Sequence, residues 1–425
     1  MSIMKIAFRN LLRFKRRTFL TGSLIAIGVI LVIVFGGLAT SFKESVIGVL
    51  TNSSLADMQI HPKGYVESID NLPLDISLNP HQLNKVAQVL DQNKNILAYS
   101  PRIRFSAMVS NYAQTSGIRL TAVYPEKENA TCVGLAKRIN GIKSYENFVK
   151  KGEIILPEVL FKGLSLKLGD EIVIIATNKD GAVNGVPLKI AGVIAGVMGP
   201  SGKDGYIHID DAKNILRMEE TDISEIAVHV KNFSKLDSIT KEVAKGLGAM
   251  IGQKHEHQKM NGSQPMAKQV FEVHSWDQLA PFSTIAQMID VLIMMVRLIL
   301  ISIVLISVMN IMMMSVYERI NEIGTIAALG TVPRKIMYLF LFEGIGLGVF
   351  SAIAGSLIGV GILVIFAISK ITLNFHGIDV LIAPTIPWGA VGVSFSTVVL
   401  ISIIGSLQPA YKASKLEPVD ALRHV

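Results

Sequence analysis

The chain has very little cysteine and no phosphate-binding motif. Cys132 is the only cysteine in 425 residues, which excludes a disulfide within the chain. The loop 199–205 contains a Gly-Lys pair. However, Val197 stands where a Walker motif needs its first glycine, and Asp204 stands where it needs Ser or Thr to bind magnesium. We expect this loop to be an ordinary turn, so any ATP and magnesium would be bound by a partner chain.

Side chains that could form a catalytic or metal site are also sparse. His255, Glu256 and His257 lie close together, with His274 downstream, but a spacing of two suits neither the i,i+4 pairing of a helix nor an HExxH site. Their polar neighbours favour a solvated loop. No Ser/His/Asp or Cys/His arrangement stands out. We therefore expect no bound metal, no cofactor and no enzymatic activity in this chain.

What the chain does have is four long apolar runs, at 18–42, 298–317, 344–369 and 380–410. Each reaches the roughly 20 residues that a helix needs to cross a bilayer. Hydrophobic residues make up 50% of the chain and are concentrated in these blocks, which is typical of a membrane protein. We predict an α-helical membrane protein with four transmembrane helices and a large α+β domain inserted between the first and second helices.

The positive charge predicts the orientation. Basic residues beside apolar runs mark the cytoplasmic side of a membrane. The first 17 residues carry six of them and no acid, and the segment after the last run carries three more: Lys5, Arg9, Arg13, Lys15, Arg16, Arg17, Lys412, Lys415 and Arg423. We therefore expect both termini in the cytoplasm and the long insertion outside. The net charge of +8 then reflects the membrane flanks and does not indicate nucleic-acid binding.

These signals divide the chain into segments. We predict a cytoplasmic amphipathic helix at 1–17, transmembrane helices at 18–42, 336–369 and 380–408, an external α+β domain at 43–281, a stalk and transmembrane helix at 282–317, a cytoplasmic helix within 318–335, a short external loop at 370–379 and a cytoplasmic tail at 409–425. Within the external domain, outer halves at 43–115 and 222–280 would enclose a strand-rich subdomain at 116–221.

The external segment alternates between strand-like and helix-like patterns. A helix is expected at 80–92 behind the capping residue Asn79, and another at 234–247. Strands are expected at 55–60, 103–109, 118–123, 153–156, 171–176, 186–197 and 225–230.

Charges and glycines in the apolar segments also carry predictions. Asp290 and Arg297 lie seven residues apart, which favours a stalk above the membrane, and Glu343 is interpreted as an interfacial carboxylate at the start of the third span. Four glycines in the third span form two small-xxx-small pairs: Gly344, Gly348, Gly355 and Gly359. Such spacing allows close helix packing, either within the subunit or between subunits.

The cytoplasmic loop predicts a short amphipathic helix. Ile320, Ile323 and Ala327 form an apolar stripe, Gly330 can end the helix, and Pro333 prevents its continuation. The acidic pair at positions 318 and 322 suits an anionic lipid surface poorly. Docking in the groove of a partner protein is therefore favoured over a connector that rests on lipid.

These residues resemble a known family. The sequence ERINEIG at 318–324, followed by ALG at 328–330, resembles the coupling-helix segment of the FtsX-like permeases, a group that includes MacB and the LolC/LolE lipoprotein-releasing subunits. The opening AFRNL at 7–11 and the ending PAYKASKLEPVDALR at 409–423 are similar to that family as well. The external domain leans toward LolC/LolE, through AVYPE at 122–126, ILPEVL at 155–160 and Trp276, whereas the coupling loop leans toward MacB.

The resemblance implies a permease of an ATP-binding cassette complex in the inner (cytoplasmic) membrane of a bacterium, with a MacB-like periplasmic domain. It would transmit motion from a cytoplasmic ATPase to that domain, for lipoprotein release or export. The partners implied are the ATPase, a second permease copy or a paralogue, membrane lipid, and a lipoprotein or a periplasmic or outer-membrane protein. The alternative is an FtsX-like regulator of an external cell-wall hydrolase. The residues expected at the ATPase contact are Glu318, Arg319, Glu322, Ile323, Ala328, Leu329 and Gly330.

Overall fold

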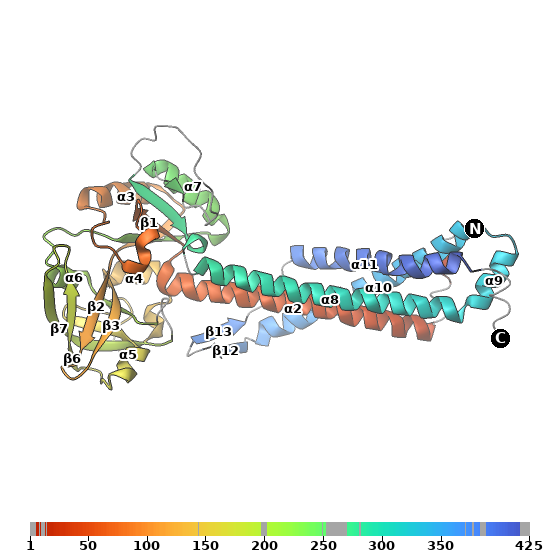
Figure 1. The fold of residues 1–425 in the computed structure, drawn as a ribbon, viewed down its shortest axis with the longest axis horizontal. Helices are drawn as coiled ribbons and strands as arrows, with labels where there is room; N and C mark the ends of the chain where they lie inside the picture. The colour runs from red at the N-terminus through yellow and green to blue at the C-terminus, as the bar shows by residue number, and fades with distance from the viewer. Residues whose placement is uncertain are drawn as a thin grey trace. The chain divides into compact units, whose positions relative to one another are not determined.

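The computed structural model describes residues 6–7, 9, 13, 15–142, 144–196, 202–248, 250–251, 270–279, 282–369, 371–375, 378–382 and 388–416. The chain divides into two compact units (Figure 1). The membrane unit comprises Met1–Glu44, Met288–Thr372 and Leu381–Val425, and the external domain comprises Ser45–Gln287 with Leu373–Val380. Most of the predicted amphipathic helix at 1–17 and the end of the tail, 417–425, lie outside the described residues.

Four long helices correspond to the four apolar runs. They are α2 (Lys15–Leu50), α8 (Phe282–Glu318), α10 (Pro333–Ser369) and α11 (Trp388–Ser414). Each is long and apolar enough to cross a membrane, and the candidate spans are Thr18–Leu55, which continues past the end of α2, Gln287–Glu318, Pro333–Ser369 and Val391–Ser414. The predicted four-helix membrane fold is therefore confirmed. Between α8 and α10 lies the short helix α9 (Ile320–Ala328) (Figure 1).

The first helix is longer than the apolar run that predicts it. α2 passes residue 42, reaches Leu50, and leads into a π-helical turn, η1 (Thr51–Leu55). The first strand therefore begins at Met58 and not at residue 55. Lys43 on α2 and Asp290 on α8 form an ion pair with 2.5 Å between Nζ and Oδ1, and the Asp290 side chain is 56% exposed. An exposed pair of this kind contributes little stability in water.

The fourth helix is shorter than predicted. We expected it to begin at residue 380, whereas α11 begins at Trp388 and β13 (Ile378–Ile382) precedes it. β13 pairs with β12 (Ile371–Phe375), so the loop predicted at 370–379 contains strand. The sequence places Pro384 and Pro387 just before α11. A helix is disfavoured there because proline lacks an N–H group and restricts the residue before it.

Glycines allow close packing of α10 against α11. A methyl group added at Gly348 would lie 2.4 Å from the Cβ of Ser402, and one at Gly344 would lie 2.5 Å from the Cβ of Ser406. Real Cβ atoms do not approach so closely, so only glycine fits at these two positions.

The other glycine pair on α10 faces a different helix. A methyl group at Gly355 would lie 2.7 Å from the Cβ of Val29, and one at Gly359 would lie 3.2 Å from Ile33, both on α2. The two small-xxx-small pairs therefore pack α10 against two neighbours within one subunit, in a core that also contains Val304, Val308 and Met312 of α8.

The external domain is built on one hydrogen-bonded sheet of 11 strands in the described part of the chain, in the order β10-β11-β1-β9-β2-β3-β8-β5-β7-β4, with β6 beside β2 and β7. The strands are β1 (Met58–Pro62), β2 (Ile96–Ser110), β3 (Thr115–Val123), β4 (Ile139–Asn140), β5 (Glu153–Pro157), β6 (Glu171–Thr177), β7 (Val183–Ile194), β8 (Asp204–His208), β9 (Glu225–Val230), β10 (Met250–Ile251) and β11 (Phe271–Ser275). Each of the seven strand-like runs overlaps one of these strands.

Among the described residues of the external domain, five helices accompany this sheet: α3 (Pro80–Gln92), α4 (Pro125–Thr131), α5 (Glu158–Gly163), α6 (Ile209–Leu216) and α7 (Leu236–Leu247). Short 3-10 turns lie at Val66–Asn71, Ala136–Arg138, Phe233–Lys235 and Trp276–Gln278. α3 has the predicted bounds because Asn79 and Gln82 form a capping box: the Asn79 side chain accepts from the Gln82 N–H at 2.9 Å, and the Gln82 side chain accepts from the Asn79 N–H at 3.0 Å.

The long strand β2 joins the two parts of the external domain. Its first half, up to Arg102, pairs with β9, and its second half, from Ile103, pairs with β3. The predicted subdomain at 116–221 is thus inserted between the outer halves in the sequence, but it is not a separate structural unit. It shares a continuous sheet and one apolar core with the outer halves, because a strand of 15 residues is long enough to belong to both.

Candidate functional site

The loop between the second and third spans folds as the short helix α9. Arg319 separates it from α8 with a non-helical backbone, at φ −112° and ψ 19°. At the other end, Gly330 adopts a left-handed conformation, with φ 85°, and its N–H donates to the Ala327 carbonyl at 3.0 Å. Pro333 then begins α10, where its missing N–H is not needed. The predicted helix and its stop signals therefore correspond to the structure.

Arg319 links α9 to the third span. Its Nη1 lies 3.1 Å and 2.9 Å from the two carboxylate oxygens of Glu343, and its Nε lies 3.1 Å from Oε2 of Glu322. The guanidinium carbon lies 5.9 Å from the centre of the Phe340 ring. Arg319 is 8% exposed and Glu343 is 6% exposed. Glu343 is therefore the buried partner of an arginine, and its predicted place at the membrane interface stays a prediction.

The seven residues predicted at the ATPase contact fall into two groups. Five are exposed: Glu318, Glu322, Ala328, Leu329 and Gly330. The other two, Arg319 and Ile323, are buried against the rest of the membrane unit. Leu329 is 82% exposed, and Ile326 and Val332 nearby are also exposed. We call Ile326, Leu329 and Val332 the α9 patch.

Described residues of the N-terminal segment lie beside α9. Ile6 and Arg13 line a groove of about 390 Å³ together with Ile326 of α9 and Ile336 and Leu339 of α10. Ile6 and Arg13 therefore lie at the same end of the membrane unit as α9.

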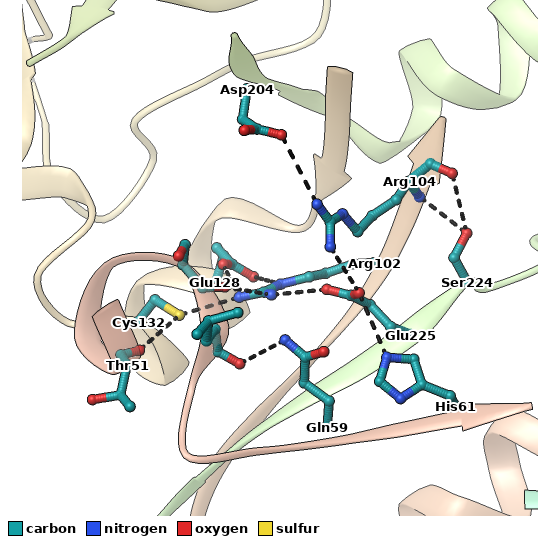
Figure 2. Close-up of polar contacts among 12 residues, drawn as sticks. Thr51, Gln59, His61, Arg102, Arg104, Glu128, Cys132, Asp204, Ser224 and Glu225 are labelled. Atoms are coloured by element: carbon teal, nitrogen blue, oxygen red, sulfur yellow. Dashed lines mark hydrogen bonds and ion pairs between the residues drawn. The ribbon is translucent and has the colours of Figure 1, made fainter. Parts of the chain in front are cut away.

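A second polar cluster lies inside the external domain (Figure 2). Arg102 of β2 donates from Nη2 and Nε to the Glu128 carboxylate of α4, at 2.6 Å and 3.0 Å, and from Nη1 to Oε1 of Glu225 on β9, at 3.0 Å. It also donates to the carbonyl of Ser54 in η1, at 2.7 Å, and to Sγ of Cys132, at 3.1 Å. Arg102, Glu128 and Glu225 are at most 2% exposed. We call this set the Arg102 cluster.

Arg104 and His61 extend the cluster on the other side of Glu225 (Figure 2). Arg104 Nη1 lies 3.3 Å and His61 Nε2 lies 3.7 Å from Oε2 of Glu225. Burial alone would raise the pKa of Glu225, but Arg104, His61 and Arg102 outweigh it and hold this pKa well below its usual range. At Asp204, burial prevails over Arg104 and raises the pKa.

The Arg102 cluster has a structural character and not a catalytic one. Its central groups are removed from solvent, and burial raises the pKa of the Cys132 thiol, which disfavours the nucleophilic thiolate. Its arginine joins η1, α4, β2 and β9, so four segments meet at one side chain. Sequence analysis missed it because Arg102 lies 26 residues from Glu128 and 123 residues from Glu225. The only hint is a charge placed beside apolar residues in a strand.

No group of three or more His, Cys, Asp or Glu side chains is arranged to hold a metal ion within the described residues. His255, Glu256 and His257 lie outside that part of the chain, and His274 is buried in β11. Residues 197–201 at the predicted turn lie outside it too. The turn's last residues, Asp204 and Gly205, belong to β8 and are buried.

His229 on β9 predicts a pH dependence of stability. His229 Nδ1 lies 2.8 Å from Oδ2 of the buried Asp57. This hydrogen bond raises the pKa of His229 above its ordinary value of 6.5, against the opposing effect of burial. A group whose pKa is raised on folding stabilises the fold fully below its unfolded pKa, and this contribution is lost as pH rises through the folded pKa. We expect the free energy of unfolding to fall as the pH rises from below 6.5 through the raised pKa of His229.

The measurement is urea unfolding of the external domain in the full chain at several pH values in that window. His229→Gln should flatten the dependence, whereas His81→Gln, on the surface of α3, should leave it unchanged. If the free energy of unfolding changes equally with pH in the wild type and in His229→Gln, His229 is not the source of the dependence.

Comparisons with known proteins agree with this architecture. A profile described as MacB-like periplasmic core domain matches residues 18–245, and a second, described as FtsX-like permease C-terminal, matches residues 294–418. The macrolide export ATP-binding/permease protein MacB of Bdellovibrio bacteriovorus is 29% identical over 57% of this chain, and the match spans 35% of that protein. The lipoprotein-releasing system transmembrane protein LolC of Neisseria meningitidis is 22% identical, over 94% of this chain and 92% of its own length.

Among solved structures, the periplasmic region of MacB from Actinobacillus actinomycetemcomitans is 14% identical, with a TM-score of 0.35, over 58% of this chain and 95% of that one. The first profile alone covers more than half of the chain. The second covers most of α8 and all of α9, α10 and α11. The chain therefore belongs to the FtsX-like permeases with a MacB-like periplasmic core domain, which are ABC transporter permeases of the MacB and LolC type.

Proposed function

We propose that this chain is the permease subunit of an ATP-binding cassette complex and transmits ATP-driven motion from a separate cytoplasmic ATPase to the external domain. The observation that carries the proposal is the α9 patch. Three apolar side chains gather on and just after a short helix, and Leu329 exposes 82% of its surface. Exposed apolar residues that cluster beside acidic ones are typical of a protein contact.

ATP binding and hydrolysis belong to the partner in this proposal. The single Gly-Lys pair in the loop at 199–205 lacks the remaining Walker residues, and the loop lies in the external domain. Both termini and α9 would face the cytoplasm, as the basic residues at the two ends favour. Two copies of this chain, or one copy with a paralogue, would pair with two ATPase subunits in the inner membrane.

For the substrate, we propose lipoprotein release or export from the inner membrane or periplasm. The support is the similarity to LolC, which extends over nearly the whole length of both chains. Purification of the native complex with identification of co-eluting proteins tests this choice. A bound lipoprotein or an outer-membrane partner would support it, whereas a co-eluting cell-wall hydrolase would favour a regulator of the FtsX type.

The docking assignment is tested with Leu329→Asp. A charge placed in the centre of an apolar contact costs about 2 kcal/mol or more, so we expect at least a roughly 30-fold loss of affinity for the ATPase. The measurement is co-purification of the ATPase with the tagged permease from membranes. Glu322 is less suitable than Leu329 because its side chain also pairs with Arg319.

The matched control is Leu97→Asp, which introduces the same charge at a leucine on the external domain that is 60% exposed. It should leave both insertion and ATPase yield unchanged. Full ATPase yield with Leu329→Asp would overturn the docking assignment.

A further inference from the structure

The side chain that fixes α9 emerges at the break between two helices. α8 ends at Glu318 and α9 begins at Ile320, so the backbone is free of helical constraint only at Arg319. Its guanidinium contacts one carboxylate on α9, Glu322, and one on α10, Glu343. A displacement of α9 must therefore either move Glu343 with it or separate a buried ion pair.

Burial makes separation of this pair costly. Both carboxylate oxygens of Glu343 accept from Arg319 Nη1, and both side chains are less than 10% exposed. Removal of one partner from a buried pair leaves a charge without compensation, a penalty far larger than for an exposed pair. The ring of Phe340, one turn before Glu343, lies against the guanidinium and adds a further contact with α10.

Glu343 also lies where α10 is locked to another span. The next residue, Gly344, packs directly against Ser406 of α11, and four residues later Gly348 packs against Ser402. A shift of the α10 start would thus be passed on to α11, because there is no free space at either contact. Successive contacts therefore connect α9 to α11: Arg319 contacts Glu343, and the adjoining part of α10 packs against α11.

We propose that Arg319 and Glu343 are positioning residues that make α9 and the start of α10 move as one body, so that a force applied by the ATPase to α9 reaches the spans. The inference rests on the proposed docking of an ATPase at α9. It assigns to Arg319 a role in transmission and not in the contact with the partner. Neither residue would touch ATP.

The test uses the assembled complex with two fluorescent probes. Cys132 is buried, so a single introduced cysteine can be labelled selectively. Probes are placed at Thr325→Cys on α9 or at Leu357→Cys on α10, both exposed positions. In the wild-type background, ATP should change the signal of both probes. In Arg319→Gln, the ATPase should still co-purify and the α9 signal should still respond, but the α10 response should be lost.

The charge-swapped chain Arg319→Glu/Glu343→Arg provides the decisive comparison, because it restores an opposite-charge pair across the same contact. It should recover the α10 response even if either single variant fails to assemble. An α10 response that survives in Arg319→Gln, or a swap that restores neither assembly nor the response, would overturn the inference. A wild-type chain that fails to bind an ATPase would instead refute the proposed function.

Discussion

Arg102→Met is expected to lower the free energy of unfolding of the external domain by about 3–5 kcal/mol, since it removes the cation from a buried ionic cluster. Glu128 would retain its burial and lose both of its bonds to Arg102, and the Ser54 carbonyl would lose its donor. Methionine preserves most of the volume of the arginine stem, so the loss reports mainly on the charge and its hydrogen bonds.

Tryptophan fluorescence offers a direct measurement. The chain contains two tryptophans, and Trp276 is buried in the external domain. In a Trp388→Phe background, urea unfolding would follow that domain within the full chain. Lys189→Met, which removes an exposed cation from strand β7 of the same sheet, is the matched control and should change the free energy by less than about 0.5 kcal/mol. A loss below about 1 kcal/mol for Arg102→Met would contradict the expectation.

A double variant separates the charge from the packing. In Arg102→Met/Glu128→Gln, the carboxylate that lost most is neutralised, while Glu225 keeps its pair with Arg104. Because removal of both partners avoids an uncompensated buried charge, we expect this variant to be more stable than Arg102→Met alone. If the double variant is less stable than the single one, packing of the Arg102 stem must dominate.

The sequence predicts the membrane fold well because its signals are local. A helix of about 20 apolar residues is required by the thickness of the bilayer, and the stop at Gly330 needs only a left-handed conformation at one residue. The fourth span shows the limit of this reasoning. Hydropathy extends it to residue 380, but two prolines before α11 override hydropathy, and the structure forms β13 instead.

The ionic contacts are not predictable in the same way because they join residues distant in sequence. Glu343 attracts notice as a charge in a span, yet its partner Arg319 lies 24 residues away across a helix and a turn. The Arg102 cluster depends on β2 pairing first with β9 and then with β3. Hydrophobic periodicity does not reveal which strands pair or in which register. Sequence analysis placed Arg319 in the contact surface because it belongs to the segment that resembles a coupling helix, and such a motif does not reveal which of its side chains turns inward.

Gly348→Leu is expected to disrupt packing of the membrane unit, with a loss of about 3 kcal/mol or more, because even its first carbon has no space. That carbon would lie 2.4 Å from both the Cβ and the Oγ of Ser402, whose hydroxyl already donates to the Val398 carbonyl at 2.9 Å. Ser402 is fully buried, so it cannot rotate away into open space. α10 and α11 would have to separate, and helix association in a membrane depends on the close packing that small residues allow.

The measurement is thermal unfolding of the full chain in detergent, monitored as the loss of the monodisperse peak in size-exclusion chromatography after heating. Gly361→Leu is the matched control, since it lies on the same helix and a side chain there meets nothing within 4 Å. The paired variant Gly348→Ser/Ser402→Gly moves the hydroxymethyl group across the same contact and should recover much of the stability lost in Gly348→Ser. Two results would contradict this expectation: the same unfolding temperature for Gly348→Leu and Gly361→Leu, or a paired variant no more stable than Gly348→Ser. Either would mean that direct contact at this position does not limit the packing of α10 on α11.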